Sequence, residues 1–367
     1  MFLLLIINLA VSLCKNNIVT INIDAFYTDG LCSVFHFPKE NIKRRYYLNT
    51  YTSFSLFSFS NFIDANIKGK KVFHFNGNIY ANLYNTDIET NSGVVVHNFS
   101  FYAASGSTSW ARDIGISLGY HYDDESFSLI HQLYKSGKIK HLKYSFNNPI
   151  EALNGTLSFG GVEGDKHLEL PYKGVIKINE ELPTWGFNLT KIKYKNETFS
   201  FNIPCIISSG MYNMLVSNDV FDSMIKNIFY EYINNRTCEI RKTSGTHDRM
   251  FLLCQKEYIF DGEIELTFEY VTVKVKIKDL FDGSNGSHFH SNSHQPIHNF
   301  NGMILGIEFL RLFNFTVFDY ENKQVEFYSD LNPIYETYSY NKLLYTIYVF
   351  VMLICLSNAI LLIKLKL

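Results

Sequence analysis

A short apolar stretch that ends in a hydroxyl and a glycine is the first candidate for chemistry. Residues 205–216 read "CIISSGMYNMLV", so an apolar run leads directly into Ser208, Ser209 and Gly210. A strand of this kind often delivers a reactive side chain to a cleft. A serine is a nucleophile only when a base activates it, and no basic residue lies near Ser208 in the sequence. A serine-hydrolase interpretation would therefore need a separate histidine and acid.

Four histidines lie close together near the end of the chain, in "HFHSNSHQPIHN" (His288, His290, His294 and His298). Imidazole is a common metal ligand, but structural zinc sites usually add cysteines or a carboxylate at fixed spacing. It lies in a loop rich in glycine, serine and asparagine and has neither companion, which favours a solvated insertion. We predict no metal site and no cofactor.

Composition limits the remaining classes of function. The chain has 367 residues, 47% of them hydrophobic, which is enough for a large two-lobed domain. Its formal net charge is −2, so the protein lacks the basic field that attracts nucleic acid.

Apolar and polar residues alternate in many short stretches along the chain. We therefore expect short strands to position any functional site. Examples are "VTINID", "GVIKIN" and "IELTFEYVTVKVKIKDL", each bounded by turn residues. Helical patterns are few, at residues 126–137 and 218–233 and in one turn at "GIEFLRLF". The sequence therefore predicts a mainly β domain.

Both ends of the chain carry targeting signals. Residues 1–14 have the apolar core of a signal peptide, and residues 343–363 form an uncharged run long enough to span a bilayer. Lys364 and Lys366 follow at once, so the tail 364–367 is predicted to be cytoplasmic, with residues 331–342 as a juxtamembrane linker. We therefore expect a single-pass type I protein of the secretory pathway or cell surface, with its main domain lumenal or extracellular.

A lumenal position makes disulfides and glycans possible. Outside the leader and the span, the cysteines are Cys32, Cys205, Cys238 and Cys254, which allow three pairings. Cys238 and Cys254 flank a segment with the pattern of a hairpin, so we favour this pair as a disulfide; Cys32 and Cys205 are left either free or paired. Seven glycosylation sequons occur, at Asn98, Asn154, Asn188, Asn196, Asn235, Asn285 and Asn314.

Three stretches in the second half of the chain carry a family resemblance. They are "NGTLSFGGVEGDKHLELPYKGVIKI", the stretch around Ser208, and "NGMILGIEFLRLFNFTVFDYENKQVEF". Their order and spacing resemble pepsin-like aspartic peptidases, in which an apolar-Asp-Thr-Gly loop is followed by an apolar-apolar-Gly strand, here Ile304, Leu305 and Gly306. The resemblance implies a mainly β, bilobal fold with lobes at residues 15–149 and 150–330.

The first half matches the same family in order. "DIGISLGY" (residues 113–120) resembles the strand behind the first catalytic loop, and residues 73–89 resemble the flap hairpin, with Phe75 in place of the flap tyrosine. By this alignment the two catalytic positions fall on His36, in "SVFHFPKE", and on Ser208, with Gly210 as the loop glycine. The disulfide between Cys238 and Cys254 also falls where family members often have one.

Family chemistry requires two carboxylates that share a proton and activate a water. Neither His36 nor Ser208 supplies one, so we predict a catalytically inactive, membrane-anchored homologue whose cleft is kept for peptide or protein binding or as a scaffold. One alternative is an active aspartic endopeptidase that uses a displaced acid, such as Asp29 or Asp64. Another is a structural surface protein. We expect a monomer with the membrane as partner, and a peptide or protein as the ligand of the cleft.

Overall fold

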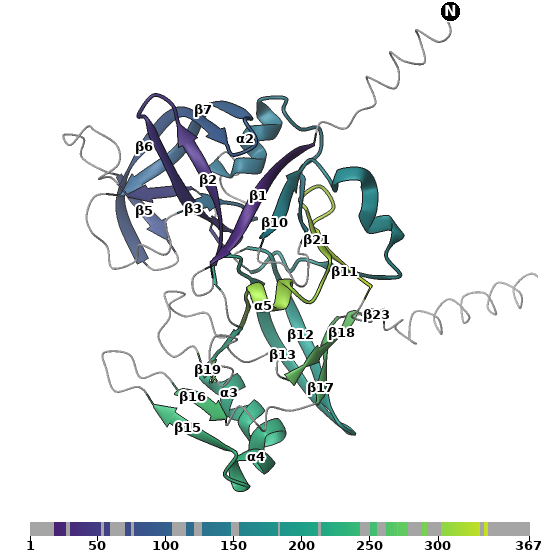
Figure 1. Ribbon diagram of the computed structural model, residues 1–367. Helices are drawn as coiled ribbons and strands as arrows, with labels where there is room; N and C mark the ends of the chain where they lie inside the picture. The colour runs from purple at the N-terminus through teal and green to yellow at the C-terminus, as the bar shows by residue number, and fades with distance from the viewer. Residues whose placement is uncertain are drawn as a thin grey trace, which may run out of the picture.

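The computed structural model describes the following residues: 18–26, 30–52, 55–58, 70–74, 77–104, 115–120, 127–147, 154–182, 184–211, 214–242, 250–254, 262–269, 271–277, 288–291, 302–330 and 334–336. Strands dominate these ranges and form two sheets, so the predicted mainly β class is confirmed. Figure 1 shows the two lobes, with the elements near β1 and β10 between them.

The first sheet has 13 strands and forms one lobe together with the centre of the molecule. In spatial order its strands are β11 (Tyr172–Lys177), β22 (Gln324–Ser329), β21 (Phe315–Asp319), β9 (Lys143–Asn147), β10 (Asn154–Phe159), β1 (Val19–Phe26), β2 (Gly30–Phe37), β3 (Ile42–Asn49), β8 (Gly115–Ser117), β4 (Leu56–Ser58), β7 (Val95–Ala104), β6 (Gly77–Thr90) and β5 (Lys70–His74). The antiparallel pair β5 and β6 forms the hairpin that the sequence predicts there.

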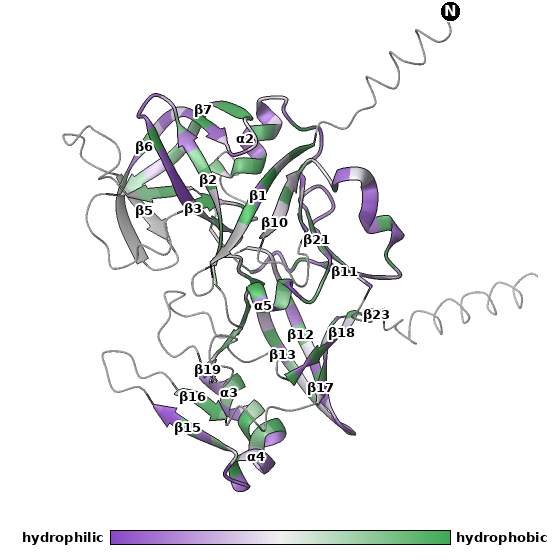
Figure 2. Cartoon of the chain, in the orientation of Figure 1, coloured by the Kyte–Doolittle hydropathy of each residue, from purple (hydrophilic) through white to green (hydrophobic). Residues whose placement is uncertain are grey.

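The second sheet has ten strands. In order they are β15 (Cys238–Lys242), β16 (Met250–Cys254), β19 (His288–Ser291), β14 (Leu215–Val216), β20 (Met303–Leu305), β13 (Glu197–Ile207), β12 (Gly186–Tyr194), β17 (Glu263–Phe268), β18 (Val271–Lys276) and β23 (Ile334–Glu336). Figure 2 shows that β15, at one edge, is largely hydrophilic, in keeping with the exposure of its last four residues.

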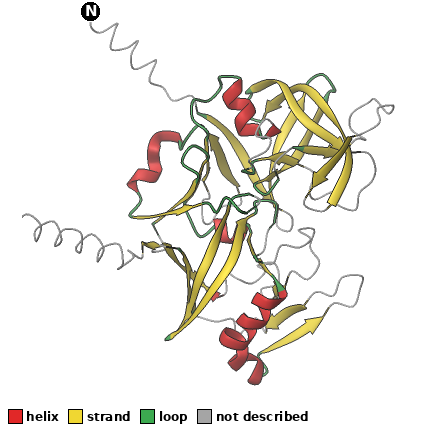
Figure 3. Ribbon diagram, turned by 180° about the vertical axis from the view of Figure 1, so that it is seen from behind, coloured by secondary structure: helices red, strands yellow, loops and turns green. Residues whose placement is uncertain are grey.

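Helices are short; those at residues 129–135, 218–234 and 307–310 match the predicted helices, whereas the 3₁₀ segment at residues 163–169 was not predicted. They are α2 (Leu129–Lys135), the 3₁₀ segment η4 (Glu163–Glu169), α3 (Asn218–Met224), the π segment η5 (Ile225–Phe229), α4 (Tyr230–Asn234) and α5 (Ile307–Leu310). The three elements from Asn218 to Asn234 follow one another without a break, and Figure 3 shows them beside the β15–β16 hairpin. In the described ranges no helix has the length and apolar character to cross a bilayer; the predicted span 343–363 lies outside them.

The chain does not divide between the sheets at residue 150. Strands β10 and β11, and later β21 and β22, belong to the first sheet although they come from the second half of the chain. β9 pairs on one side with β10 and on the other with β21. The central sheet is therefore built from both halves and ties the lobes together.

The predicted disulfide between Cys238 and Cys254 is confirmed. The two residues face each other directly across the antiparallel pair β15 and β16, with their Cα atoms 4.0 Å apart. Cys32 and Cys205 are buried in β2 and β13. Burial raises the pKa of the Cys205 thiol far above its usual value, which keeps this thiol protonated and unreactive.

We expect the buried carboxylate of Asp319, in β21, to stabilise the central sheet in a pH-dependent manner. Burial alone would raise its pKa, but hydrogen bonds from Lys143 Nζ (2.7 Å) and from the Asn322 backbone (2.9 Å) and side chain (2.7 Å) outweigh burial and lower it. A lowered folded-state pKa stabilises the fold above about pH 4, and this stability is lost as the pH falls through the folded-state value.

Asp319→Asn should lower the free energy of unfolding by about 1–3 kcal/mol at neutral pH, because Lys143 loses its partner. Urea denaturation at pH 7 and at about pH 3 measures the effect, which should shrink at the lower pH. Glu231→Gln is the control, since its ion pair with Lys195 is exposed and screened by water. Equal losses in the two variants would contradict the role given to Asp319.

Candidate functional site

The first of two similar loops begins where β3 ends, at Asn49. β3 runs parallel to β8, with Asn49 opposite Ser117, and the Leu118 amide donates to the Asn49 carbonyl at 2.8 Å. The Gly119 amide donates to the Thr52 carbonyl at 3.1 Å. A Cβ at Gly119 would lie 2.2 Å from that carbonyl oxygen, so the close approach requires glycine. The strand "GISLGY" thus backs this loop, as the sequence predicts for the first catalytic loop.

The second loop begins where β13 ends, at Ser208. β13 runs parallel to β20, with Ile207 opposite Leu305, and the Ser208 amide donates to the Leu305 carbonyl at 2.9 Å. The Ile307 amide donates to the Met211 carbonyl at 2.8 Å. Each loop therefore follows a strand, is backed by a short parallel strand, and is held by main-chain hydrogen bonds at both ends.

The two loops bind each other through one hydroxyl residue from each lobe. Thr50 Oγ1 donates to the Ile207 carbonyl at 2.8 Å and accepts from the Ser209 amide at 2.9 Å. In return, Ser209 Oγ accepts from the Thr50 amide at 3.1 Å and donates to the Leu48 carbonyl. A further link joins the Leu31 amide to the Ser209 carbonyl at 2.8 Å. We call Thr50, Ser209 and these bonds the loop interlock.

The residue before each interlock hydroxyl lies at the centre of the arrangement. These residues are Asn49 and Ser208, and neither has any exposed surface. Asn49 points toward the other loop, because a Cβ at Gly210 would lie 2.3 Å from Asn49 Oδ1 and 2.9 Å from the Tyr51 ring. Ser208 Oγ is buried and has no hydrogen-bond partner within the described residues.

A cluster of buried aromatic side chains anchors the back of the first loop. The Leu118 carbonyl accepts hydrogen bonds from Tyr144 Oη (2.8 Å), Trp185 Nε1 (2.9 Å) and Tyr320 Oη (3.0 Å), which come from different parts of the chain. The rings also pack together, with Trp185 and Tyr320 centroids 4.7 Å apart. Burial raises the pKa of Tyr144, so its hydroxyl remains a donor. The loop therefore rests on a buried aromatic cluster that holds it by hydrogen bonds.

Asn49 and Ser208, which we call the central pair, can take part in few kinds of reaction. An asparagine amide and a serine hydroxyl do not titrate in the range where a general base works, so neither can take a proton from a water. No group of three or more histidine, cysteine, aspartate or glutamate residues in the described ranges is arranged to hold a metal ion. The pair can form hydrogen bonds, but it lacks the two proton-sharing carboxylates that an acid–base mechanism requires.

The structure corrects the assignment of His36. His36 lies within β2, opposite Lys43 of β3 and Glu89 of β6, and its Nδ1 is 3.0 Å from Glu89 Oε2. β2 continues to Phe37, so the first loop comes one strand later than predicted. The residue of the first lobe that corresponds to Ser208 in the interlock is Asn49, not His36.

A weak pattern in the sequence could have identified Asn49 as the counterpart of Ser208. Leu48-Asn49-Thr50 and Ile207-Ser208-Ser209 share the order apolar, polar, hydroxyl at the end of a strand. The pattern was hidden because Tyr51 stands where a loop glycine is expected. Tyr51 does not adopt a positive φ, so the backbone here does not require glycine.

The other predicted site residues have mixed outcomes. Ile304 and Leu305 belong to β20, Gly306 is the N-cap residue of α5, and Gly210 lies against the Asn49 side chain. Phe75, Asp29 and Asp64 lie outside the described residues, as do the side chains of the histidine cluster.

Comparisons with known proteins agree with this architecture. The family model described as "Eukaryotic aspartyl protease" matches residues 76–329. The crystal structure of an aspartic proteinase from Irpex lacteus superposes with a TM-score of 0.61 at 14% sequence identity, and the match covers 88% of this chain and 99% of that one. No curated protein matches the chain at a significant level.

The interlock should dominate the stability of this region. Thr50→Val keeps the side-chain shape but leaves the Ser209 amide and the Ile207 carbonyl without partners, so the free energy of unfolding should fall by about 2–4 kcal/mol. Urea denaturation measures the loss.

Thr52→Val in the same loop is a matched control. Thr52 Oγ1 is buried and has no hydrogen-bond partner within the described residues, so removing it should cost less than about 1 kcal/mol or even stabilise the protein. If Thr50→Val proved no more harmful than Thr52→Val, the interlock would not hold the lobes as we describe.

Proposed function

Because the chain belongs to the eukaryotic aspartyl protease family, we propose that it is a membrane-anchored member that does not cleave peptides and that serves as a scaffold or binding protein. The family resemblance implies that catalysis needs two aspartates, one at the tip of each loop. The single observation that carries the proposal is the loop interlock. It pairs Thr50 with Ser209, which supports assigning Asn49 and Ser208 to the two tips.

The identity of these two residues removes the acid–base chemistry. In the family's mechanism one carboxylate takes a proton from the attacking water and the other gives a proton to the substrate. Asn49 and Ser208 replace both with neutral groups, and each such group contributes orders of magnitude in rate. The first loop also carries Tyr51 in place of the family's glycine. Loss of both carboxylates at once is difficult to reconcile with peptidase activity.

Complete burial of the central pair favours the scaffold over a ligand seated on these two residues. Asn49, Ser208 and Ser209 have no exposed surface, and Tyr51 is only 2% exposed. A peptide would have to open the loops to reach them. Recognition of a partner therefore falls to surfaces outside the central pair. The structural surface protein remains the second candidate, favoured by the same burial.

Membrane anchoring is proposed from the sequence. The uncharged run 343–363, followed by Lys364 and Lys366, supports a single span with a cytoplasmic tail. The disulfide between Cys238 and Cys254 supports an oxidising compartment for the main domain. The leader, residues 1–14, supports the same orientation.

The absence of peptidase activity is tested directly. The full chain, purified in mild detergent, should leave a peptide library uncut from about pH 3 to 7, because Asn49 and Ser208 offer no proton-sharing pair of carboxyls. A pepsin-type inhibitor whose hydroxyl is designed to lie between two aspartates should bind weakly. Inhibitor-sensitive cleavage by the unmodified chain would instead indicate an acid outside the described residues, such as Asp29 or Asp64.

The position of the central pair is tested by restoring both carboxyls. In Asn49→Asp/Ser208→Asp, adjacent like charges should raise the pKa of one carboxyl in the folded state. The variant's free energy of unfolding should then fall as pH rises above about 4, by about 1.4 kcal/mol for each unit of the raised pKa.

A double-mutant cycle separates this repulsion from simple burial. Urea denaturation of Asn49→Asp and Ser208→Asp alone gives the desolvation cost of each carboxyl, and the double variant should lose more than the sum of the two at pH 7. Additive losses would mean that the two side chains are not neighbours, and the assignment of Asn49 would be wrong.

Glycosylation tests the proposed lumenal location. Asn98, Asn196 and Asn235 are exposed, whereas Asn188 and Asn314 are half-buried. Expression in a glycosylating host should therefore give glycans at some of the three exposed sites, seen as a loss of mass after enzymatic deglycosylation. An unmodified chain from such a host would argue against a lumenal domain.

A further inference from the structure

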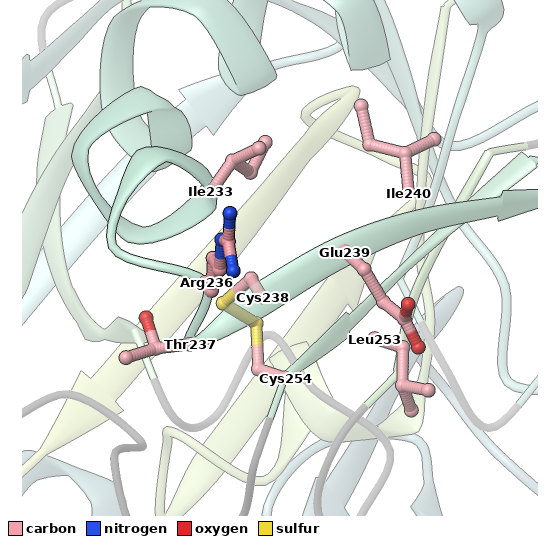
Figure 4. Close-up of a pocket in the computed structure, with 8 residues that line it drawn as sticks. All are labelled: Ile233, Arg236, Thr237, Cys238, Glu239, Ile240, Leu253 and Cys254. Carbon is pink, nitrogen blue, oxygen red and sulfur yellow. A yellow bond between two sulfur atoms is a disulfide. The ribbon is translucent and has the colours of Figure 1, made fainter.

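The second lobe carries a cavity of about 620 Å³ between the end of α4 and the β15–β16 hairpin. Its lining residues are Ile233, Arg236, Thr237, Cys238, Glu239, Ile240, Leu253 and Cys254. Figure 4 shows Arg236 beside Ile233 on the helix side, with Glu239, Ile240 and Leu253 on the hairpin side. None of these residues belongs to the two loops or to the interlock, so the cavity is a separate feature.

Covalent and hydrogen bonds hold the backbone on both sides of this cavity. The disulfide joins Cys238 to Cys254. At the end of α4, both the amide and the hydroxyl of Thr237 donate to the Tyr232 carbonyl, at 3.0 and 2.9 Å, and the Arg236 amide donates to the Ile233 carbonyl at 3.0 Å. These bonds constrain the backbone that carries the lining side chains.

The cavity combines apolar surface with one uncompensated positive charge. Ile240 is 45% exposed, and Ile233 and Leu253 are half-buried. Glu239 forms an ion pair with Arg241, which neutralises the carboxylate of the lining. Arg236 has no ion-pair or side-chain hydrogen-bond partner among the described residues. The remaining charge therefore favours an acidic ligand.

The backbone at Arg236 makes a glycine substitution informative. Arg236 has a φ of 59°, in the left-handed region that suits glycine after a helix. An arginine at this position costs conformational energy that glycine would not. Replacing Arg236 by glycine should therefore remove the side chain without straining the backbone.

One edge of the second sheet borders the cavity. In the described part of the chain β15 pairs only with β16, so no described strand occupies its other edge. An extended peptide can add to such an edge, and the neighbouring pocket then selects its side chains.

From these contacts we propose that the cavity and the free edge of β15 bind an extended segment of a partner protein, with an acidic side chain on Arg236 and an aliphatic side chain against Ile240 and Leu253. This inference does not depend on whether the protein cleaves peptides. It gives the second lobe a binding surface of its own, apart from the central pair.

The test uses the full chain in detergent micelles and a fluorescein-labelled peptide of about eight residues, in which two aspartates flank a leucine among valines and serines. Fluorescence anisotropy should show saturable binding below about 100 µM, and the same peptide with asparagine in place of aspartate should bind at least about fivefold more weakly. A third peptide with N-methylated backbone amides should not bind, because it cannot pair with β15.

Arg236→Gly is the decisive variant. Glycine relieves the left-handed backbone, so the melting temperature should stay the same or rise, yet the preference for the acidic peptide should disappear. Lys195→Gln removes a positive charge elsewhere on this lobe and should leave the preference unchanged. The proposal is overturned if wild-type protein binds neither peptide at about 1 mM, if it binds both equally, or if Arg236→Gly retains the preference.

Discussion

The hydroxyls of Thr50 and Ser209 hold the centre of this molecule together. Each binds main-chain groups of the opposite loop, so neither loop has its full set of hydrogen bonds without the other. The bonds are buried, where an unmade hydrogen bond costs more than it does in water. Through β3 and β13 the interlock fixes how the two sheets meet.

The groups that hold the two loops together are different from the side chains at the loop tips, where a reactive group would lie. The hydroxyls and main-chain groups of the interlock keep the loop geometry whatever side chain precedes them. The interlock is therefore compatible with the neutral side chains of Asn49 and Ser208. A neutral pair has none of the like-charge repulsion that two adjacent carboxylates would bring to a buried centre.

The sequence predicted the features that depend on local patterns. The second loop, the helices near residues 129 and 218 and the pair Cys238–Cys254 each have a clear signal within a short stretch. The first loop does not, because Tyr51 removes the glycine by which it would be recognised and an earlier strand offers His36 as a substitute. Only the hydrogen bonds between residues 159 positions apart identify Asn49 as the counterpart of Ser208. Local patterns also could not predict which sheet each strand joins, because this depends on pairing between strands that are far apart in the sequence.

The place of β9 has a consequence for how the chain folds. β9 joins β10, its neighbour in sequence, to β21, which is made near the end of the described chain. Pairing of such distant strands closes a long loop, and high contact order of this kind slows folding. During synthesis the first half must wait with an open sheet edge at β9 until residues 315–319 emerge. An exposed edge of this kind can pair wrongly with another strand, and a chaperone that covered it would prevent such mispairing.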